Sequence, residues 1–69
     1  MKTISVESEL YREYVYSDGV YRIEHPVQVH VMDNDSHRVI DTEGVTHRPS
    51  LGWLAIRWKP INDESAFVA

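Results

Sequence analysis

Three glutamates and a tyrosine recur at alternate positions near the N-terminus: Glu7, Glu9, Tyr11 and Glu13. In an extended strand, residues i and i+2 lie on one face, about 6.6 to 6.8 Å apart. The spacing therefore predicts an acidic row with one aromatic member, which could orient a basic partner or imitate a run of phosphates. A solvated outer face that discourages pairing at a sheet edge is the simpler interpretation.

The aromatic residues supply a second kind of chemistry, because tyrosine, tryptophan and arginine dominate protein-binding hot spots. Trp53 and Trp58 differ in parity, so in a regular strand they face opposite sides and one of them is exposed. We expect that tryptophan to join the acidic row in a partner-binding surface. The same residue types stack on single-stranded nucleic acid, but the net charge of −4 favours a protein partner.

The four histidines fit no metal site. His37 and His47 fall on opposite arms of a predicted hairpin, diagonal to one another, and no recognised ligand spacing is present. Asp33-Asn34-Asp35 resembles the start of a calcium loop but lacks the glycine and the acid required at the sixth and twelfth positions. We therefore expect neither a metal nor a cofactor.

Catalysis has little support in the sequence. There is no cysteine nucleophile, no glycine-rich phosphate loop, and little room for a pocket of about 300 Å³ beside the core of so small a domain. Ser36 precedes His37, but neighbouring side chains of a strand point to opposite faces and cannot form a nucleophile–base pair. The chain is therefore predicted not to be an enzyme.

Length and composition set the class of the protein. A chain of 69 residues forms one small domain that buries only about 60% of its unfolded surface, and without cysteine it has no disulfide. The longest apolar run, residues 53–56, is far shorter than the roughly 20 residues of a membrane span. The N-terminus also lacks the apolar stretch of a signal peptide. These features predict a cytoplasmic protein without a membrane partner.

Nine valines and five isoleucines against three alanines and three leucines predict strands. The first predicted strand spans residues 3–16, with an apolar even face and an acidic odd face. The alternation fails at Arg12, which indicates either a bulge there or a short helical turn over residues 7–13. Further strands are predicted at the following ranges: 20–24, 27–32, 37–40, 45–48 and 53–58.

The turns between these strands have recognisable chemistry. Asp18-Gly19 predicts a hairpin turn with glycine at positive φ, and residues 41–44 predict a second one with Gly44 in the left-handed conformation. We therefore predict an all-β domain over residues 1–60, an antiparallel meander of five or six strands closed into a barrel or folded as a sandwich. Residues 61–69 are predicted to be a C-terminal tail or a short edge strand.

The segments 10–14, 21–23, 37–41 and 52–60 together resemble the small orphan proteins of bacteriophages and prophages. Those proteins are similarly short, acidic, free of cysteine and rich in strands, with tryptophan near the end. The resemblance implies a phage accessory protein in the host cytoplasm. Many such proteins occupy a surface of a host protein, including anti-CRISPR and other anti-defence inhibitors, and others are minor virion parts. It carries over no functional residues.

Three functions follow as expectations. The first is a non-enzymatic protein-binding module, an inhibitor or adaptor that acts on a host or viral protein with a basic surface. The second is a minor virion or self-assembling structural subunit, which the oligomeric mass in solution would distinguish. The third is a single-stranded nucleic-acid binder, which salt-dependent binding to an oligonucleotide would reveal.

Overall fold

The computed structural model describes residues 1–61, which form seven strands in two antiparallel sheets and contain no helix. The all-β class predicted from composition is therefore confirmed. The strands are β1 (Lys2–Ser5), β2 (Glu9–Tyr16), β3 (Gly19–Glu24), β4 (Pro26–Val31), β5 (His37–Asp41), β6 (Thr46–His47) and β7 (Ala55–Pro60). Across these described residues, no helix is present that could cross a membrane.

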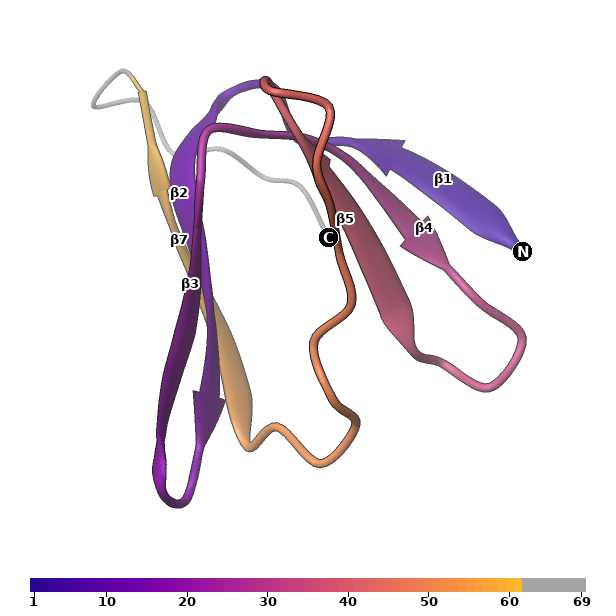
Figure 1. Cartoon of the computed structure of the whole chain (residues 1–69), viewed down its shortest axis with the longest axis vertical. Coiled ribbons are helices and arrows are strands. Elements are labelled where there is room, and N and C mark those ends of the chain that lie inside the picture. Colours follow the sequence, from indigo (N-terminus) through magenta and orange to yellow (C-terminus); the bar gives the residue numbers. More distant parts are fainter. Residues whose placement is uncertain (62–69) are drawn as a thin grey trace.

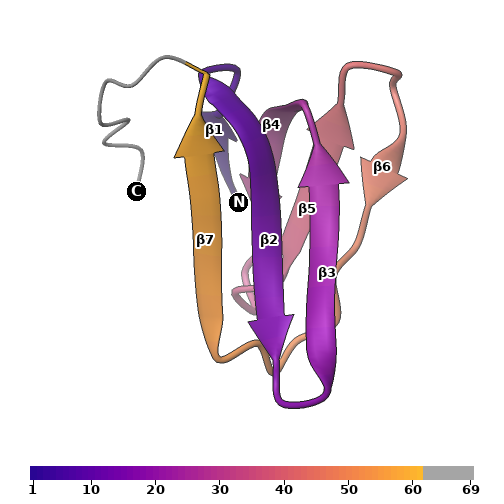
Figure 2. The same cartoon turned by 90° about the vertical axis from the view of Figure 1, so that its left-hand side faces the viewer.

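The order of the strands differs from a simple meander. One sheet has the order β1-β4-β5-β6 and the other has the order β3-β2-β7, as Figures 1 and 2 show. The predicted hairpins β2–β3 and β5–β6 are confirmed by their pairing. However, β1 and β2 belong to different sheets, and β7 returns from the end of the described chain to lie beside β2. Among residues 1–61, no strand pairing closes the two sheets into a barrel.

The predicted strand over residues 3–16 is divided by a turn. The backbone N–H of Glu9 donates to the carbonyl of Val6 at 2.9 Å, so the chain turns at Glu7 and Ser8 instead of continuing straight. The predicted irregularity is present, but it lies between Glu9 and Tyr11, where the register of β2 with β7 shifts. The helical turn considered over residues 7–13 is not formed.

The two predicted glycine turns have different outcomes. Gly44 has a φ of 79°, as predicted for the turn between β5 and β6. Gly19 does not have a positive φ, because the turn consists of Ser17 and Asp18 and Gly19 already pairs with Tyr16. The predicted tail or edge strand over residues 61–69 lies, apart from Ile61, outside the described residues.

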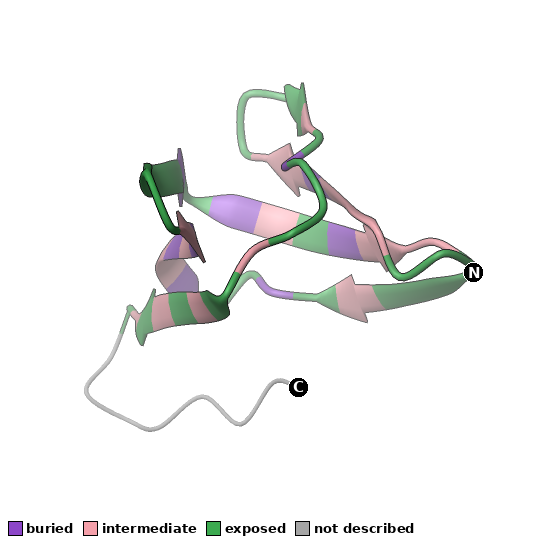
Figure 3. Ribbon diagram, turned by 90° about the horizontal axis from the view of Figure 1, so that it is seen from below, coloured by how far each residue is buried: buried purple, intermediate pink, exposed green. Residues whose placement is uncertain are grey.

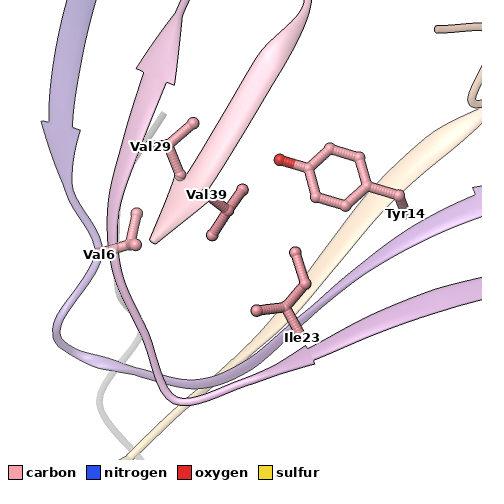
Figure 4. Close-up of a cluster of buried hydrophobic side chains, with 5 residues drawn as sticks. All are labelled: Val6, Tyr14, Ile23, Val29 and Val39. Carbon is pink, nitrogen blue, oxygen red and sulfur yellow. The ribbon is translucent and has the colours of Figure 1, made fainter. Parts of the chain in front are cut away.

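The core lies between the facing sides of the two sheets. Its fully buried apolar side chains point toward one another from both sheets in Figure 4: Val6, Tyr14, Ile23, Val29 and Val39. The sheets meet at one end of the molecule and diverge at the other, where the connection from β6 to β7 crosses between them (Figure 1). We call this second end the open end. Figure 3 views the molecule from below and shows the exposed stretch 50–52 of that connection in green.

Candidate functional site

The predicted acidic row is not assembled on one exposed face. Glu7 lies exposed in the turn before β2, whereas Glu9 is fully buried and Tyr11 and Glu13 are half-buried. The physical reason is the turn at residues 7–8 followed by the register shift, which together rotate Glu9 toward the interior. The expectation that Glu9 lies with its neighbours on an exposed surface is therefore wrong.

Glu9 instead forms a buried ion pair within β2. The guanidinium Nη1 of Arg12 donates to Glu9 Oε2 at 2.9 Å, and the side chains are 3% and 0% exposed. Burial raises the pKa of the Glu9 carboxyl above its usual range, although the charge of Arg12 acts in the opposite direction. The guanidinium also lies 5.4 Å from the ring centroid of Trp58 and 5.8 Å from that of Tyr14. This pair is part of the core.

Glu13 is on the outer face of β2, between two arginines. Its carboxylate is 2.9 Å from Nη2 of Arg57 in β7 and 3.6 Å from Nη1 of Arg22 in β3. The Arg22 guanidinium lies 3.7 Å from the ring centroid of Tyr11 and is also bonded to Glu24. The outer face is therefore compensated in charge, and it does not present the uncompensated acidic row expected to attract a basic partner.

One of the two tryptophans was expected to be exposed, but neither is. Trp53 precedes β7, so the parity argument did not apply. Its ring lies 5.0 Å from that of the core residue Tyr14 and 4.9 Å from that of the half-buried His37, between centroids. Trp58 lies opposite Arg12 in the pairing of β2 with β7 and turns to the same side. Both rings are half-buried, which leaves Glu7 as the one exposed member of the predicted partner-binding set.

A concavity of about 400 Å³ lies at the open end. We call it the tyrosine concavity; its lining residues are Tyr16, Asp18, Tyr21, Arg48, Pro49, Ser50 and Leu51. The hydroxyl of Tyr16 donates to the carbonyl of Ser50 at 2.7 Å, which ties β2 to the connection between β6 and β7. Burial raises the pKa of Tyr16 and favours this donating form. Leu51 is 54% exposed at the rim, an apolar side chain available for contact.

The second tyrosine of this concavity is fixed by a hydrogen-bonded relay. His47 Nε2 lies 2.7 Å from Asp41 Oδ2, and His47 Nδ1 lies 2.8 Å from the hydroxyl of Tyr21. In the tautomer whose Nε2–H donates to the carboxylate, Nδ1 accepts a hydrogen bond from the Tyr21 hydroxyl. The hydrogen bond between His47 Nε2 and Asp41 is the largest of the causes that hold the pKa of Asp41 below its usual range. The relay links β3 to the other sheet and orients the ring of Tyr21.

A second concavity of about 370 Å³ adjoins the first and shares its wall, residues 48–51. We call it the arginine concavity; its further lining residues are Asn34, Ser36, His37 and Arg38. Burial, followed by the charge of Arg12, lowers the pKa of His37, whose Nδ1 accepts the hydroxyl of Tyr14 at 2.7 Å. His37 is therefore a neutral wall of this concavity.

No group of three or more histidine or acidic side chains in residues 1–61 is placed to hold a metal ion. The residues that the sequence interpretation missed are Tyr16, Tyr21, Arg48 and Leu51. The one local signal was Leu51 itself, an apolar residue set among the turn formers Pro49, Ser50 and Gly52. Nothing local indicated that this turn lies against β2 and β3.

Comparison with known proteins finds no match to a protein family, to a curated protein or to a solved structure. The resemblance to phage accessory proteins therefore stays a prediction. The function is inferred below from the surface of the molecule.

Proposed function

We propose that the chain is a non-enzymatic protein-binding module that docks through its open end. The observation that carries this proposal is the tyrosine concavity, with the exposed Leu51 at its rim and Arg48 in its wall. Tyrosine and arginine around a concavity with an exposed leucine are the residue types that protein-binding hot spots favour.

The concavity is also preorganised. Tyr16 and Tyr21 each have their hydroxyl bonded within the protein, to Ser50 and to His47. A tyrosine ring held in this way loses little conformational entropy when a partner covers it. Leu54, 73% exposed, follows Leu51 in the same connection and is a second exposed apolar side chain of that segment.

Together with the resemblance to phage accessory proteins, the proposal takes a more specific form. The module would act as an inhibitor or adaptor on a host protein in the host cytoplasm, with an anti-defence role among the candidates. We take the scaffold to be a small sandwich, since the core lies between two sheets that no pairing within residues 1–61 joins.

A photo-cross-linking amino acid at position 51 tests the proposal in a bacterial lysate. The matched control carries the same amino acid at position 45, because Val45 is 50% exposed, against 54% for Leu51, and lies in the turn between β5 and β6. We expect one stoichiometric adduct with a foreign protein from position 51 and none from position 45. Adducts only with copies of the chain would support the self-assembling subunit instead, and equal labelling at both positions would overturn the docking surface.

A further inference from the structure

We propose that Arg38 and Arg48 form a carboxylate-binding subsite of the docking surface. The partner would present an acidic side chain to the arginine concavity and a neighbouring apolar side chain to the tyrosine concavity. This inference rests on the proposed protein-binding function and adds the chemistry of the partner segment.

The two arginines lie at one concavity: Arg38 is in β5, and Arg48 directly follows the last residue of β6. Val39 pairs with His47 and Ile40 with Thr46, so Arg38 and Arg48 each adjoin the last pair of the β5–β6 ladder. Both side chains line the arginine concavity. Two like charges at one concavity repel one another, and a bound anion relieves that repulsion.

Among residues 1–61, these two side chains are also the arginines without an ion pair. Arg12, Arg22 and Arg57 each pair with a glutamate. Within residues 1–61, neither Arg38 nor Arg48 forms an ion pair, and none of the residues lining the arginine concavity is acidic. Although the whole chain has a net charge of −4, two cations of its described part thus line one concavity without an acidic partner from residues 1–61. An arginine fork binds a carboxylate in a bidentate manner.

The remaining charges favour a single carboxylate over a nucleic acid. Asp18 lines the neighbouring tyrosine concavity, and Asp33 and Asp35 are exposed in the turn between β4 and β5. A nucleic-acid strand needs a continuous basic groove along its backbone, and these acids would repel further phosphates. An isolated acidic side chain next to an apolar one meets both concavities without crossing the acids.

The shared wall explains why both groups would belong to one partner segment. Residues 48–51 separate the two concavities, and Arg48 and Leu51 line both of them. An acid held by Arg48 therefore brings its neighbour in the partner chain close to Leu51 and the tyrosine rings. Charge would select the partner and speed association, while the apolar contact would slow dissociation.

The test is an NMR titration of the full chain with the peptide acetyl-Glu-Leu-Glu-amide. Its matched neutral probe is acetyl-Gln-Leu-Gln-amide, and its polyanion probe is a thymidine tetranucleotide, all at one ionic strength. We expect the Nε–H signals of Arg38 and Arg48 to shift saturably with the acidic peptide, and those of Arg22 and Arg57, already paired, to shift little. The neutral peptide should bind about tenfold more weakly.

Three single substitutions complete the test. Arg48→Gln should abolish the difference in affinity between the acidic and neutral peptides. Lys59→Gln removes the same charge from β7 and should leave the ratio of the two affinities within twofold of that of the unchanged protein. Equal binding of both peptides, an equal loss in the Lys59 variant, or tighter binding of the tetranucleotide would each overturn the subsite. A different result is a foreign protein that cross-links at position 51 and binds Arg38→Gln and Arg48→Gln as tightly as the unchanged chain. That result would support the protein-binding function and overturn the carboxylate subsite alone.

Discussion

Arg12 donates a hydrogen bond of 2.9 Å to Glu9 in the interior, three positions apart in β2. Two charges withdrawn from water cost a large desolvation energy, which their mutual attraction offsets only while both are present. Glu9 Oε1 and Arg12 Nε have no hydrogen-bond partner among the described residues, so the pair is incompletely satisfied. The free energy of unfolding should therefore be sensitive to a single substitution of either residue.

Removing one member of this pair should therefore be far more harmful than removing both. We expect Arg12→Met to lower the free energy of unfolding by about 3 kcal/mol or more, because it leaves the Glu9 carboxyl buried without its partner. The double variant Glu9→Leu, Arg12→Met should recover most of that loss, since apolar side chains of similar volume need no partner. Urea unfolding measures both, and a double variant no more stable than the single one would contradict this account.

Gly44 and Gly19 form a matched pair for a backbone prediction. A Cβ added at either position meets no atom within 4 Å, but only Gly44 has a positive φ, 79°. We expect Gly44→Val to cost about 1 to 2 kcal/mol of stability, because a β-branched residue resists this conformation. Gly19→Val, at the first residue of β3, should cost much less. Equal losses in thermal or urea unfolding would show that φ is not the cause.

Burial lowers the pKa of His37, which gives a prediction for acid stability. A group whose pKa is depressed by folding contributes stability above its unfolded pKa, about 6.5 for histidine, and loses it as the pH falls through the folded value. The free energy of unfolding should therefore decrease between pH values of about 7.5 and 5.5. In His37→Gln the decrease should be smaller than in the unchanged protein. The raised pKa of Glu9 contributes in the opposite direction, but it does so in both proteins and therefore cancels when their pH profiles are compared. Identical pH profiles would exclude His37 as the cause.

Glu13 distinguishes the outer face of β2 from the open end. Its carboxylate is already paired with Arg22 and Arg57, so we expect Glu13→Gln to cost under about 1 kcal/mol and to leave affinity for the partner within about twofold. The acidic row inferred from sequence predicts a loss of affinity instead. If Glu13→Gln lowers the affinity for the partner tenfold or more in a binding titration, the outer face of β2 is the binding site instead of the open end.

Strand positions, hairpins and the left-handed Gly44 could be predicted because they depend on local pattern: alternation, turn residues and β-branched composition. The turn at Glu7 and Ser8 could not, because it follows from the pairing of β1 with β4 rather than with the second sheet. The burial of Glu9 depends on that turn and on Arg12. The site escaped prediction for a similar reason, since Leu51 meets Tyr16 and Tyr21 only when the sheets have assembled.

The measurement that most directly tests docking through the open end is the dissociation constant of the purified cross-linked partner for three proteins. These are the unchanged chain, Leu51→Asp and the matched variant Val45→Asp, which places the same charge at a similarly exposed position at the other end. We predict that Leu51→Asp weakens binding about tenfold or more and that Val45→Asp changes it less than about twofold. Equal effects of the two substitutions, or none from Leu51→Asp, would contradict the account.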